Sequence, residues 1–293
     1  MTAPSPYAAA LARIPVVERS LSAAGSTTRY WEYGDADAET TIVAVHGFRG
    51  DHHGLEPVVA QLPQFRIISP DLPGFGLSDP LPAGHDIDAY VGWLRAFLEG
   101  LEVRGRLVLL GHSFGSIVAS AAVAAGVEVD DLILVNPIGA PALEGPRGVM
   151  TRLAVLYYRA GAALPERAGF ALLRNRVIVR VMSISMAKTK DRDLRRFVHD
   201  QHDRYFSAFS DRDVVLEAFR ASVSHDVSEY AHDITTRTLL IAAEKDDITP
   251  LAAEVRLQTL FPDAELQVIE DVGHLIHYET PLAAAEHIRS FLT

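Results

Sequence analysis

Cysteine is absent from this chain of 293 residues. Disulfide bonds, thiolate metal sites and a cysteine nucleophile are therefore excluded, and any catalytic group must act through oxygen or nitrogen. A chain without disulfides also fits a reducing compartment.

Long apolar runs and an excess of positive charge are missing as well. No stretch approaches the roughly 20 consecutive apolar residues that span a bilayer, and residues 1–20 lack the basic and apolar regions of a signal peptide. We therefore expect a soluble, cytoplasmic protein without an integral membrane segment. The net charge of −11 argues against nucleic acid as a partner, because phosphate binding needs clustered Lys and Arg. A small molecule is the expected partner, and the oligomeric state is left open.

Short β-branched runs alternate with helical segments along most of the chain, which is typical of a parallel sheet covered by helices on both faces. With 48% hydrophobic residues, the chain can bury one large core. The pattern predicts a doubly wound, mostly parallel α/β sheet of eight strands. We expect edge strands at 15–24 and 27–33, further strands at 41–47, 66–71, 106–113, 131–137, 238–246 and 265–273, and helices at 54–62, 86–100, 114–125, 251–261 and 280–292.

Residues 138–230 break this alternation. The segment is too long for a crossover, lacks strand-like alternation and contains helical patterns such as RDLRRFVHDQHDRYFSAF. We interpret it as a helical cap inserted into a core that comprises residues 1–137 and 231–293.

The sequence GHSFG, from Gly111 to Gly115, lies between an apolar strand and a helix of small residues. This context is typical of a nucleophile elbow, a sharp turn that exposes a serine and requires small residues two positions before and after it. Ser113 is the candidate nucleophile. The N–H of Phe114 would lie at a helix N-terminus, where negative charge is stabilised.

A second glycine-containing loop, HGFRG at 46–50, follows the strand expected at 41–47. The N–H of Phe48 is our candidate for the second oxyanion donor. For the side chain of His46 we favour a structural hydrogen bond in the interior, and we expect Arg49, His52 and His53 to be solvated.

A serine nucleophile needs a histidine base held by a carboxylate. His274 follows the last expected strand, at the carboxyl edge where α/β sheets carry their sites. Asp246 follows the preceding strand in EKDDITP and is the candidate acid; Asp247 is the alternative, and an N-cap role would also explain either aspartate. The strand at 131–137 ends in Asn136, so the other position open to the acid holds no carboxylate.

Together these motifs, with DLPGFGLSD at 71–79 and the order Ser113, Asp246, His274, resemble the α/β-hydrolase superfamily over nearly the whole chain. The likeness is to its esterase, C–C hydrolase and epoxide hydrolase branch, but epoxide hydrolases and haloalkane dehalogenases carry Asp at the position of Ser113. The resemblance implies the α/β-hydrolase fold and acyl transfer to water with no metal or organic cofactor.

Other polar patterns carry less information. The sequence HDQH at 199–202 and the pair His52 and His53 lack the spacing of known metal sites, so no metal is expected. Within the expected cap, Arg174, Arg176 and Arg180 fit either a substrate carboxylate or a solvated face. The aromatic residues Tyr205, Phe206 and Phe209 fit either an apolar substrate pocket or ordinary core.

The leading hypothesis is a serine hydrolase that cleaves a carboxylic ester of a small to medium lipophilic acyl substrate through an acyl-enzyme on Ser113. The alternatives are a C–C bond hydrolase of vinylogous diketones and a ligand receptor on the same scaffold without turnover. Amide and lactone substrates also stay open, since the fold does not fix the function.

Overall fold

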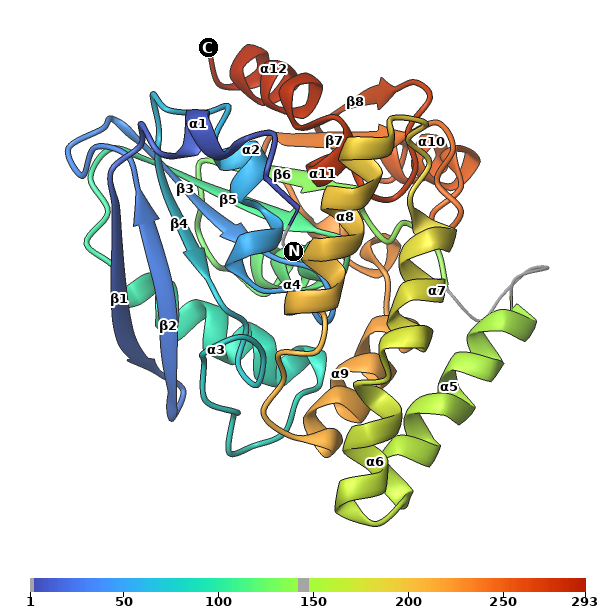
Figure 1. Ribbon diagram of the computed structural model, residues 1–293. Coiled ribbons are helices and arrows are strands. Elements are labelled where there is room, and N and C mark those ends of the chain that lie inside the picture. The colour runs from blue at the N-terminus through green and yellow to red at the C-terminus, as the bar shows by residue number, and fades with distance from the viewer. Residues whose placement is uncertain (1–2, 142–147) are drawn as a thin grey trace.

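The computed structural model describes residues 3–141 and 148–293, and its strands form one eight-stranded sheet (Figure 1) in the order β1-β2-β4-β3-β5-β6-β7-β8. The pairs β1–β2 and β2–β4 are antiparallel, and all other pairs are parallel. The strands are β1 (Val16–Ala23), β2 (Ser26–Tyr33), β3 (Thr40–Val45), β4 (Arg66–Pro70), β5 (Arg106–His112), β6 (Asp131–Val135), β7 (Thr238–Ala243) and β8 (Ala264–Ile269).

Helices connect the parallel strands and cover the sheet. The α-helices are α1 (Ala8–Leu11), α2 (Glu56–Val59), α3 (Ile87–Glu99), α4 (Phe114–Ala124), α5 (Gly148–Ala163), α6 (Glu166–Leu173), α7 (Arg176–Met186), α8 (Arg192–Tyr205), α9 (Arg212–Ser224), α10 (Leu251–Gln258), α11 (Ile276–Glu279) and α12 (Pro281–Leu292). Single 3₁₀ turns are η1 (His52–Gly54), η2 (Val227–Glu229) and η3 (Ala231–Asp233).

The central strands are buried on both faces, because successive side chains of a strand point to opposite sides. In β3, Val43 and Val45 belong to the core beneath α3 and α4, whereas Ile42 and Ala44 belong to the core beneath α2 and α12. The continuous apolar runs of the sequence therefore serve two separate cores. The predicted doubly wound, mostly parallel α/β fold is confirmed.

Several predicted boundaries were too long at the carboxyl ends of strands. The strand expected at 131–137 ends at Val135, since Asn136 has a φ of 46°. The strand expected at 265–273 ends at Ile269, before a turn at Asp271 with a φ of 60°. The helix expected at 54–62 was also wrong in extent: only Glu56–Val59 is α-helical, preceded by η1. After β6 and β8 the chain turns out of the sheet and continues in loops at its carboxyl edge.

Between β6 and β7 the described chain is helical, and α5 to α9 lie together at the carboxyl edge of the sheet (right side of Figure 1). We call these five helices the helical insertion, or simply the insertion. The division into a core and a cap at residues 138 and 230 stays a prediction. Within the described parts of the chain, no helix is both long and apolar enough to cross a membrane.

The packing of Trp93 gives a test of the core beneath α3. Trp93 is fully buried, its Nε1 donates to Oγ1 of Thr28 over 2.8 Å, and its ring stacks on Phe97. We expect Trp93→Ala to lower the free energy of unfolding by about 3–5 kcal/mol, because it opens a cavity. Urea denaturation measures this loss.

The matched control is Leu282→Ala on α12, where the side chain is 53% exposed. This change should stay within about 0.5 kcal/mol of the parent. Equal losses in the two variants would contradict the assignment of Trp93 to the core.

Candidate active site

The turn from β5 into α4 holds Ser113 in a backbone conformation that side chains rarely adopt, with φ 52° and ψ −118°. Space around this turn is minimal: a Cβ at Gly111 would lie 2.4 Å from the carbonyl oxygen of Gly115, and one at Gly115 would lie 2.3 Å from that of Val45. Only glycine fits at these two positions. The predicted elbow geometry is present, and it presents Ser113 above the edge of the sheet.

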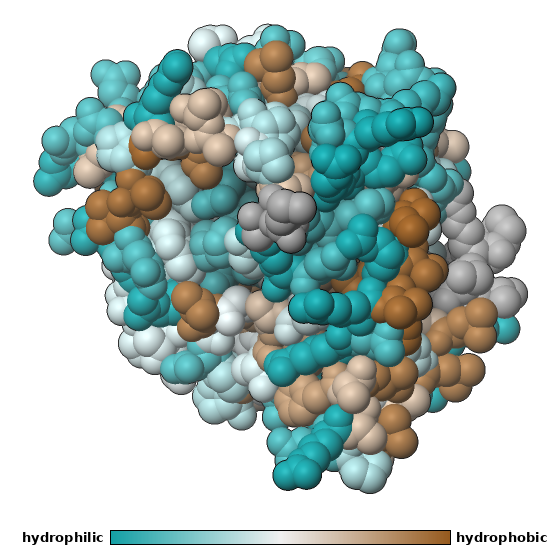
Figure 2. All heavy atoms as spheres, in the orientation of Figure 1, coloured by the Kyte–Doolittle hydropathy of each residue, from teal (hydrophilic) through white to brown (hydrophobic). Residues whose placement is uncertain are grey.

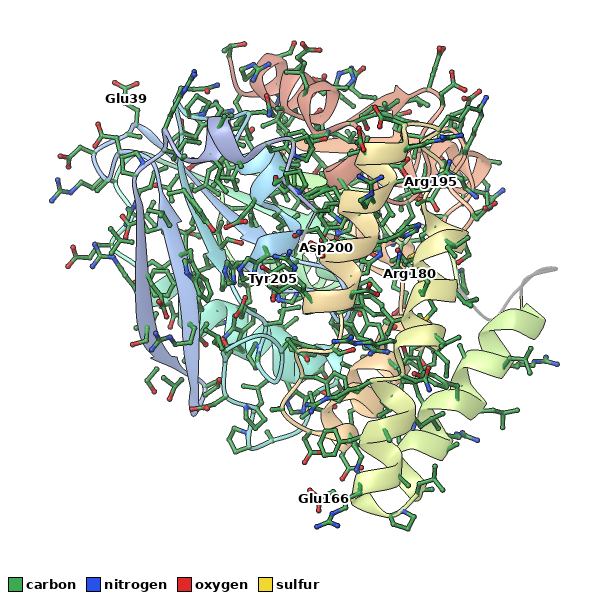
Figure 3. The ribbon with its side chains drawn as sticks, viewed as in Figure 1. Glu39, Glu166, Arg180, Arg195, Asp200 and Tyr205 are labelled. Atoms are coloured by element: carbon green, nitrogen blue, oxygen red, sulfur yellow. The ribbon has the colours of Figure 1, made fainter. Side chains whose placement is uncertain are left out.

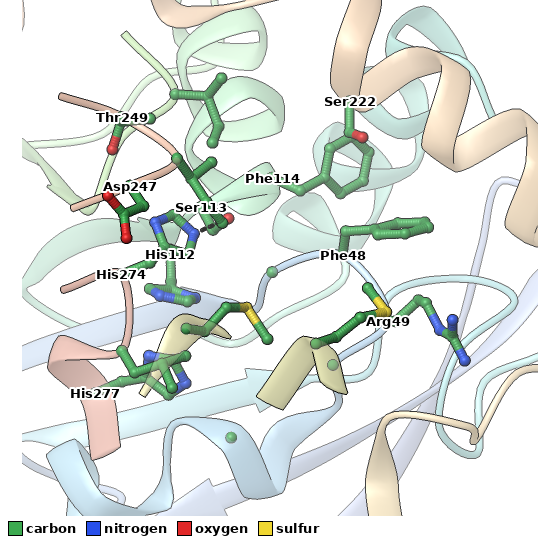
Figure 4. A pocket seen from close by; sticks show the side chains of 18 of the residues that line it. Phe48, Arg49, His112, Ser113, Phe114, Ser222, Asp247, Thr249, His274 and His277 are labelled. Atoms are coloured by element: carbon green, nitrogen blue, oxygen red, sulfur yellow. Dashed lines mark hydrogen bonds between the residues drawn. The ribbon is translucent and has the colours of Figure 1, made fainter. Parts of the chain in front are cut away.

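Three residues far apart in sequence meet at this edge. The Nε2 of His274 lies 2.8 Å from Oγ of Ser113, and its Nδ1 lies 2.7 Å from Oδ2 of Asp246. Because the carboxylate accepts, Nδ1 is the protonated nitrogen and Nε2 can accept the serine hydroxyl proton. Figure 4 shows this contact between His274 and Ser113 at one side of a cavity.

Asp246 is buried and accepts four further hydrogen bonds. Its Oδ1 accepts from the backbone N–H groups of Ile248 and Thr249, and its Oδ2 accepts from Thr249 Oγ1 and from Asn136 Nδ2. Burial alone would raise the pKa of Asp246, but attraction to His274 and these hydrogen bonds outweigh it and lower the pKa to about 2. The carboxylate therefore stays charged at neutral pH. Asp247 instead lies at the surface in an ion pair with Lys188.

Asn136 is a site residue that the sequence interpretation missed. It was considered only as a position without a carboxylate, yet its Nδ2 lies 3.0 Å from Oδ2 of Asp246. Its place directly after β6, beside β7 in the sheet, was the available signal.

Glu254, on α10, is a second unpredicted neighbour of Asp246. Its side chain is 1% exposed. Neither carboxyl oxygen makes a hydrogen bond of good geometry to a described residue, and the nearby backbone of Gly139 offsets burial only in part. Burial, and then repulsion from Asp246, raise the pKa of Glu254 to about 9. Glu254 is therefore protonated at neutral pH, and it adds no charge that would compete with Asp246 for His274.

The loop after β3 lies against the serine turn. A Cβ at Gly47 would lie 3.2 Å from Cβ of Ser113, and the rings of Phe48 and Phe114 meet edge to face at 6.4 Å. The N–H of Phe48 has no acceptor among the described residues. The N–H of Phe114, first in α4, has no acceptor within its helix. Both N–H groups thus belong to segments that pack against each other at the serine turn.

His46 is buried and anchors this loop, as its structural interpretation required. Its Nδ1 donates to the carbonyl oxygen of Gly47 over 2.8 Å, and its Nε2 accepts from the N–H of Leu72 over 2.8 Å. Burial lowers the pKa of His46, so the neutral ring fits this pair of bonds.

The expected solvation of Arg49 and His52 is wrong. Arg49 is 1% exposed and donates to the carbonyl oxygens of Phe206 and Leu173, over 2.9 and 2.8 Å. These carbonyls lie at the ends of α8 and α6, where helix dipoles favour a positive charge. Figure 4 shows the Arg49 side chain directed away from Ser113. Arg49 therefore ties the Phe48 loop to two helices of the insertion.

His52, His53 and Asp51 bring three potential ligand atoms within 4.8 Å of one another, the one such group among the described residues. The side chains of these residues also make hydrogen bonds within the protein: His52 Nδ1 lies 2.8 Å from Asp71 Oδ1, and His53 Nδ1 lies 3.1 Å from Asp51 Oδ1. The group therefore holds the loop through protein contacts. His199 and His202 of the HDQH motif both bond to Oγ of Ser183.

Other histidines surround His274 in a neutral state. Burial, followed by repulsion from neighbouring histidines, lowers the pKa of His112 and that of His202 to about 3 and lowers the pKa of His277 far below its usual value. The Nε2 of His112 and the Nδ1 of His277 lack partners among the described residues. Only His274 contacts both the serine and the carboxylate.

A cavity of about 1100 Å³ opens over Ser113 between the sheet edge and the helical insertion. Most of its lining is apolar, as expected of small-molecule sites. Of the aromatic residues proposed for such a lining, Tyr205 and Phe206 reach the cavity, whereas Phe209 is buried in the core, where its ring stacks on Phe170. The apolar lining includes Phe48, Phe114, Ile138, Met182, Met186, Phe206, Phe219, Val223 and Leu275.

None of Arg174, Arg176 and Arg180 lines the cavity. Arg174 donates to the carbonyl oxygen of Phe209 and lies over its ring. Arg180 extends from α7 to α8 (Figure 3), where it pairs with Asp203. The structure therefore gives these arginines no contact with a substrate in the cavity.

The sequence profile of the alpha/beta hydrolase family matches residues 42–287, which is most of the chain. The chain belongs to this family.

Individual members of the alpha/beta hydrolase family resemble it at modest identity. An uncharacterized hydrolase of Bacillus subtilis, YugF, is 26% identical over 90% of this chain and 93% of its own length. Lipase 1 of Psychrobacter immobilis is 24% identical over 92% of this chain and 81% of the lipase. An esterase from Exiguobacterium antarcticum has the same fold, with a TM-score of 0.76, 18% identity and coverage of 94% and 99%.

Protonation of Glu254 makes a prediction about stability and pH. The folded protein keeps a proton that the unfolded chain releases above the ordinary pKa of 4.5, so burial of Glu254 lowers the free energy of unfolding increasingly between pH 4.5 and 9. Glu254→Gln has no proton to release. We expect it to be more stable than the parent, with a gain that grows with pH and reaches up to about 3 kcal/mol at pH 7.

Urea denaturation across this pH range measures the gain. Glu286→Gln, an exposed glutamate on α12, is the matched control and should show no such trend. A difference between Glu254→Gln and the parent that does not change with pH would contradict a protonated Glu254.

Proposed function

We propose that this protein is a serine hydrolase in which Ser113 is the nucleophile, His274 the general base and Asp246 the acid that orients it. The observation that carries the proposal is the contact of 2.8 Å between His274 Nε2 and Ser113 Oγ, on a histidine whose Nδ1 is held by a buried carboxylate. A hydroxyl is a poor nucleophile until such a base removes its proton.

The proposed reaction proceeds in two halves. In the first, Ser113 Oγ attacks the substrate carbonyl carbon while His274 takes its proton, and the carbonyl oxygen becomes an oxyanion beside the N–H groups of Phe48 and Phe114. The C–O bond to the alcohol then breaks as His274 returns the proton to the leaving group. In the second half, water attacks the acyl-enzyme through the same base and releases the acid and free Ser113.

Throughout the cycle the charge on His274 rises and falls next to Asp246. Since the pKa of Asp246 is lowered to about 2, the carboxylate stays ionised and stabilises the protonated imidazole. The neutral His112 and His277 place no competing positive charge beside it. Among these four side chains, only Asp246 and, when it is protonated, His274 therefore carry charge.

The cavity supports a carboxylic ester with a small to medium lipophilic acyl group as the substrate class. Its volume of about 1100 Å³ and apolar lining favour burial of a hydrocarbon chain. The similarity to a lipase and the shared fold with an esterase fit this class.

Hydrolysis of p-nitrophenyl esters of increasing acyl length tests the proposal. We expect a rate optimum at one acyl length, set by the cavity, and loss of turnover by at least about 10³-fold in Ser113→Ala. Ser120→Ala is the control for changes in folding, because Ser120 is a buried serine of the same helix whose hydroxyl has no hydrogen-bond partner among the described residues. Turnover retained in Ser113→Ala would contradict the mechanism, and a lack of turnover in the parent with every ester would contradict the substrate class.

Substitutions at the two adjacent aspartates, Asp246 and Asp247, distinguish a carboxylate that orients His274 from one that only adds surface charge. Asp246→Asn keeps the shape of the side chain but removes the charge that fixes the tautomer of His274, so we expect kcat to fall by about 10³–10⁴-fold. Asp247→Asn breaks an exposed pair with Lys188 and should change kcat less than about threefold. The reverse order of losses would assign the acid to Asp247.

A further inference from the structure

Two helices of the insertion present apolar side chains to solvent. On α7, Val177, Val181 and Ile184 are 70%, 61% and 58% exposed, and their spacing of four and three residues places them on one helix face. On α5, Leu153 and Leu156 are 54% and 60% exposed. Figure 2 shows hydrophobic side chains gathered over this side of the molecule. We call these five residues the outer apolar face.

Positive charge accompanies the outer apolar face. Residues 148–190 contain eight Lys and Arg and a single acidic residue, in a chain whose net charge is −11. Arg180 and Lys188 are paired with Asp203 and Asp247 from outside the stretch, and the other basic residues leave an excess of positive charge. The acidic residue, Glu166, lies at the far end of the insertion (Figure 3). Arg152 and Arg159 on α5 and Arg176 on α7 are exposed. By helical spacing, Arg152 and Arg159 flank the leucines of α5.

The opposite faces of the same two helices line the active-site cavity. Ala154 of α5 and Met182 and Met186 of α7 border it. The width of one helix therefore separates the outer apolar face from the cavity over Ser113. A partner bound to the outer apolar face would therefore lie next to the active-site cavity.

We propose that the outer apolar face is a docking surface for an anionic phospholipid membrane. Helices that bind in the membrane interface combine an apolar face with Lys and Arg at its borders, because the hydrocarbon stems insert while the charges reach the phosphates. Basic residues near such a surface are attracted by anionic lipids. This mode of binding requires no helix that crosses the bilayer.

Charge also argues against a second copy of the chain as the occupant. A two-fold contact places the same face of each copy against the other, so two faces with the same excess of positive charge would be brought together. Like charges at an interface disfavour association. A surface of opposite charge satisfies both the apolar and the basic parts of the face.

Sedimentation with lipid vesicles tests the proposal. All proteins carry Ser113→Ala, so that vesicles stay intact and binding is read without turnover; failure of the proposed hydrolase chemistry leaves this result unaffected. We expect binding to vesicles of phosphatidylcholine with phosphatidylglycerol to exceed binding to phosphatidylcholine alone by at least about tenfold, and to weaken as salt is added.

Paired variants assign the binding to the outer apolar face. Val177→Ser with Val181→Ser, and separately Arg152→Gln with Arg159→Gln, should each reduce binding by at least about fivefold. The controls are Val16→Ser with Val17→Ser on β1, where the side chains are 53% and 48% exposed, and Arg13→Gln with Arg104→Gln. Both controls should bind like the parent.

Three results would overturn the proposal. Equal binding to the two kinds of vesicle would remove the role of anionic lipid, and unchanged binding in both variants of the face would place the contact elsewhere. A parent that runs as a dimer in size-exclusion chromatography, and becomes monomeric in Val177→Ser with Val181→Ser, would assign the face to a second copy.

Discussion

The turn that joins β5 to α4 is the constraint on which the site depends. It holds Ser113 at a φ of 52°, a conformation that costs free energy and persists only where the surroundings enforce it. The enforcement comes from the central strands, since the turn fits only because Gly111 and Gly115 let β3, β5 and α4 approach closely. The sheet order then brings the loops after β6, β7 and β8 to the same edge, where Asn136, Asp246 and His274 lie.

Electrostatics at this edge follow from burial. Titratable groups around the triad are held neutral: His112 and His277 have lowered pKa values, and Glu254 has a raised one. Asp246 keeps its charge because five hydrogen bonds replace the water it lost. Because the neighbouring groups are neutral, no other charge among them competes for the interaction between Asp246 and His274. The low dielectric of the interior makes this interaction stronger than it would be in water.

Local signals in the sequence were enough to predict the fold class and to propose Ser113, Asp246 and His274, which the structure brings within hydrogen-bond distance. A strand, a tight turn and a helix can be recognised within a few residues. Burial of Arg49 could not be predicted, since its partners Phe206 and Leu173 lie more than 120 residues away and no periodicity links them. Strand ends were overextended for a related reason. The residues that leave the sheet to build the site are still apolar or follow an apolar run, so hydrophobic pattern does not mark where pairing stops.

The central claim is that the elbow makes Ser113 a nucleophile through His274, and a reaction at that one oxygen tests it most directly. The protein is treated with a fluorophosphonate, which forms a bond to phosphorus at an activated serine and releases fluoride, and the modified residue is located by mass spectrometry of its peptides. The account predicts a single adduct, on Ser113, and its loss in His274→Ala. An adduct on another serine such as Ser116, or equal labelling of Ser113 in His274→Ala, would contradict it.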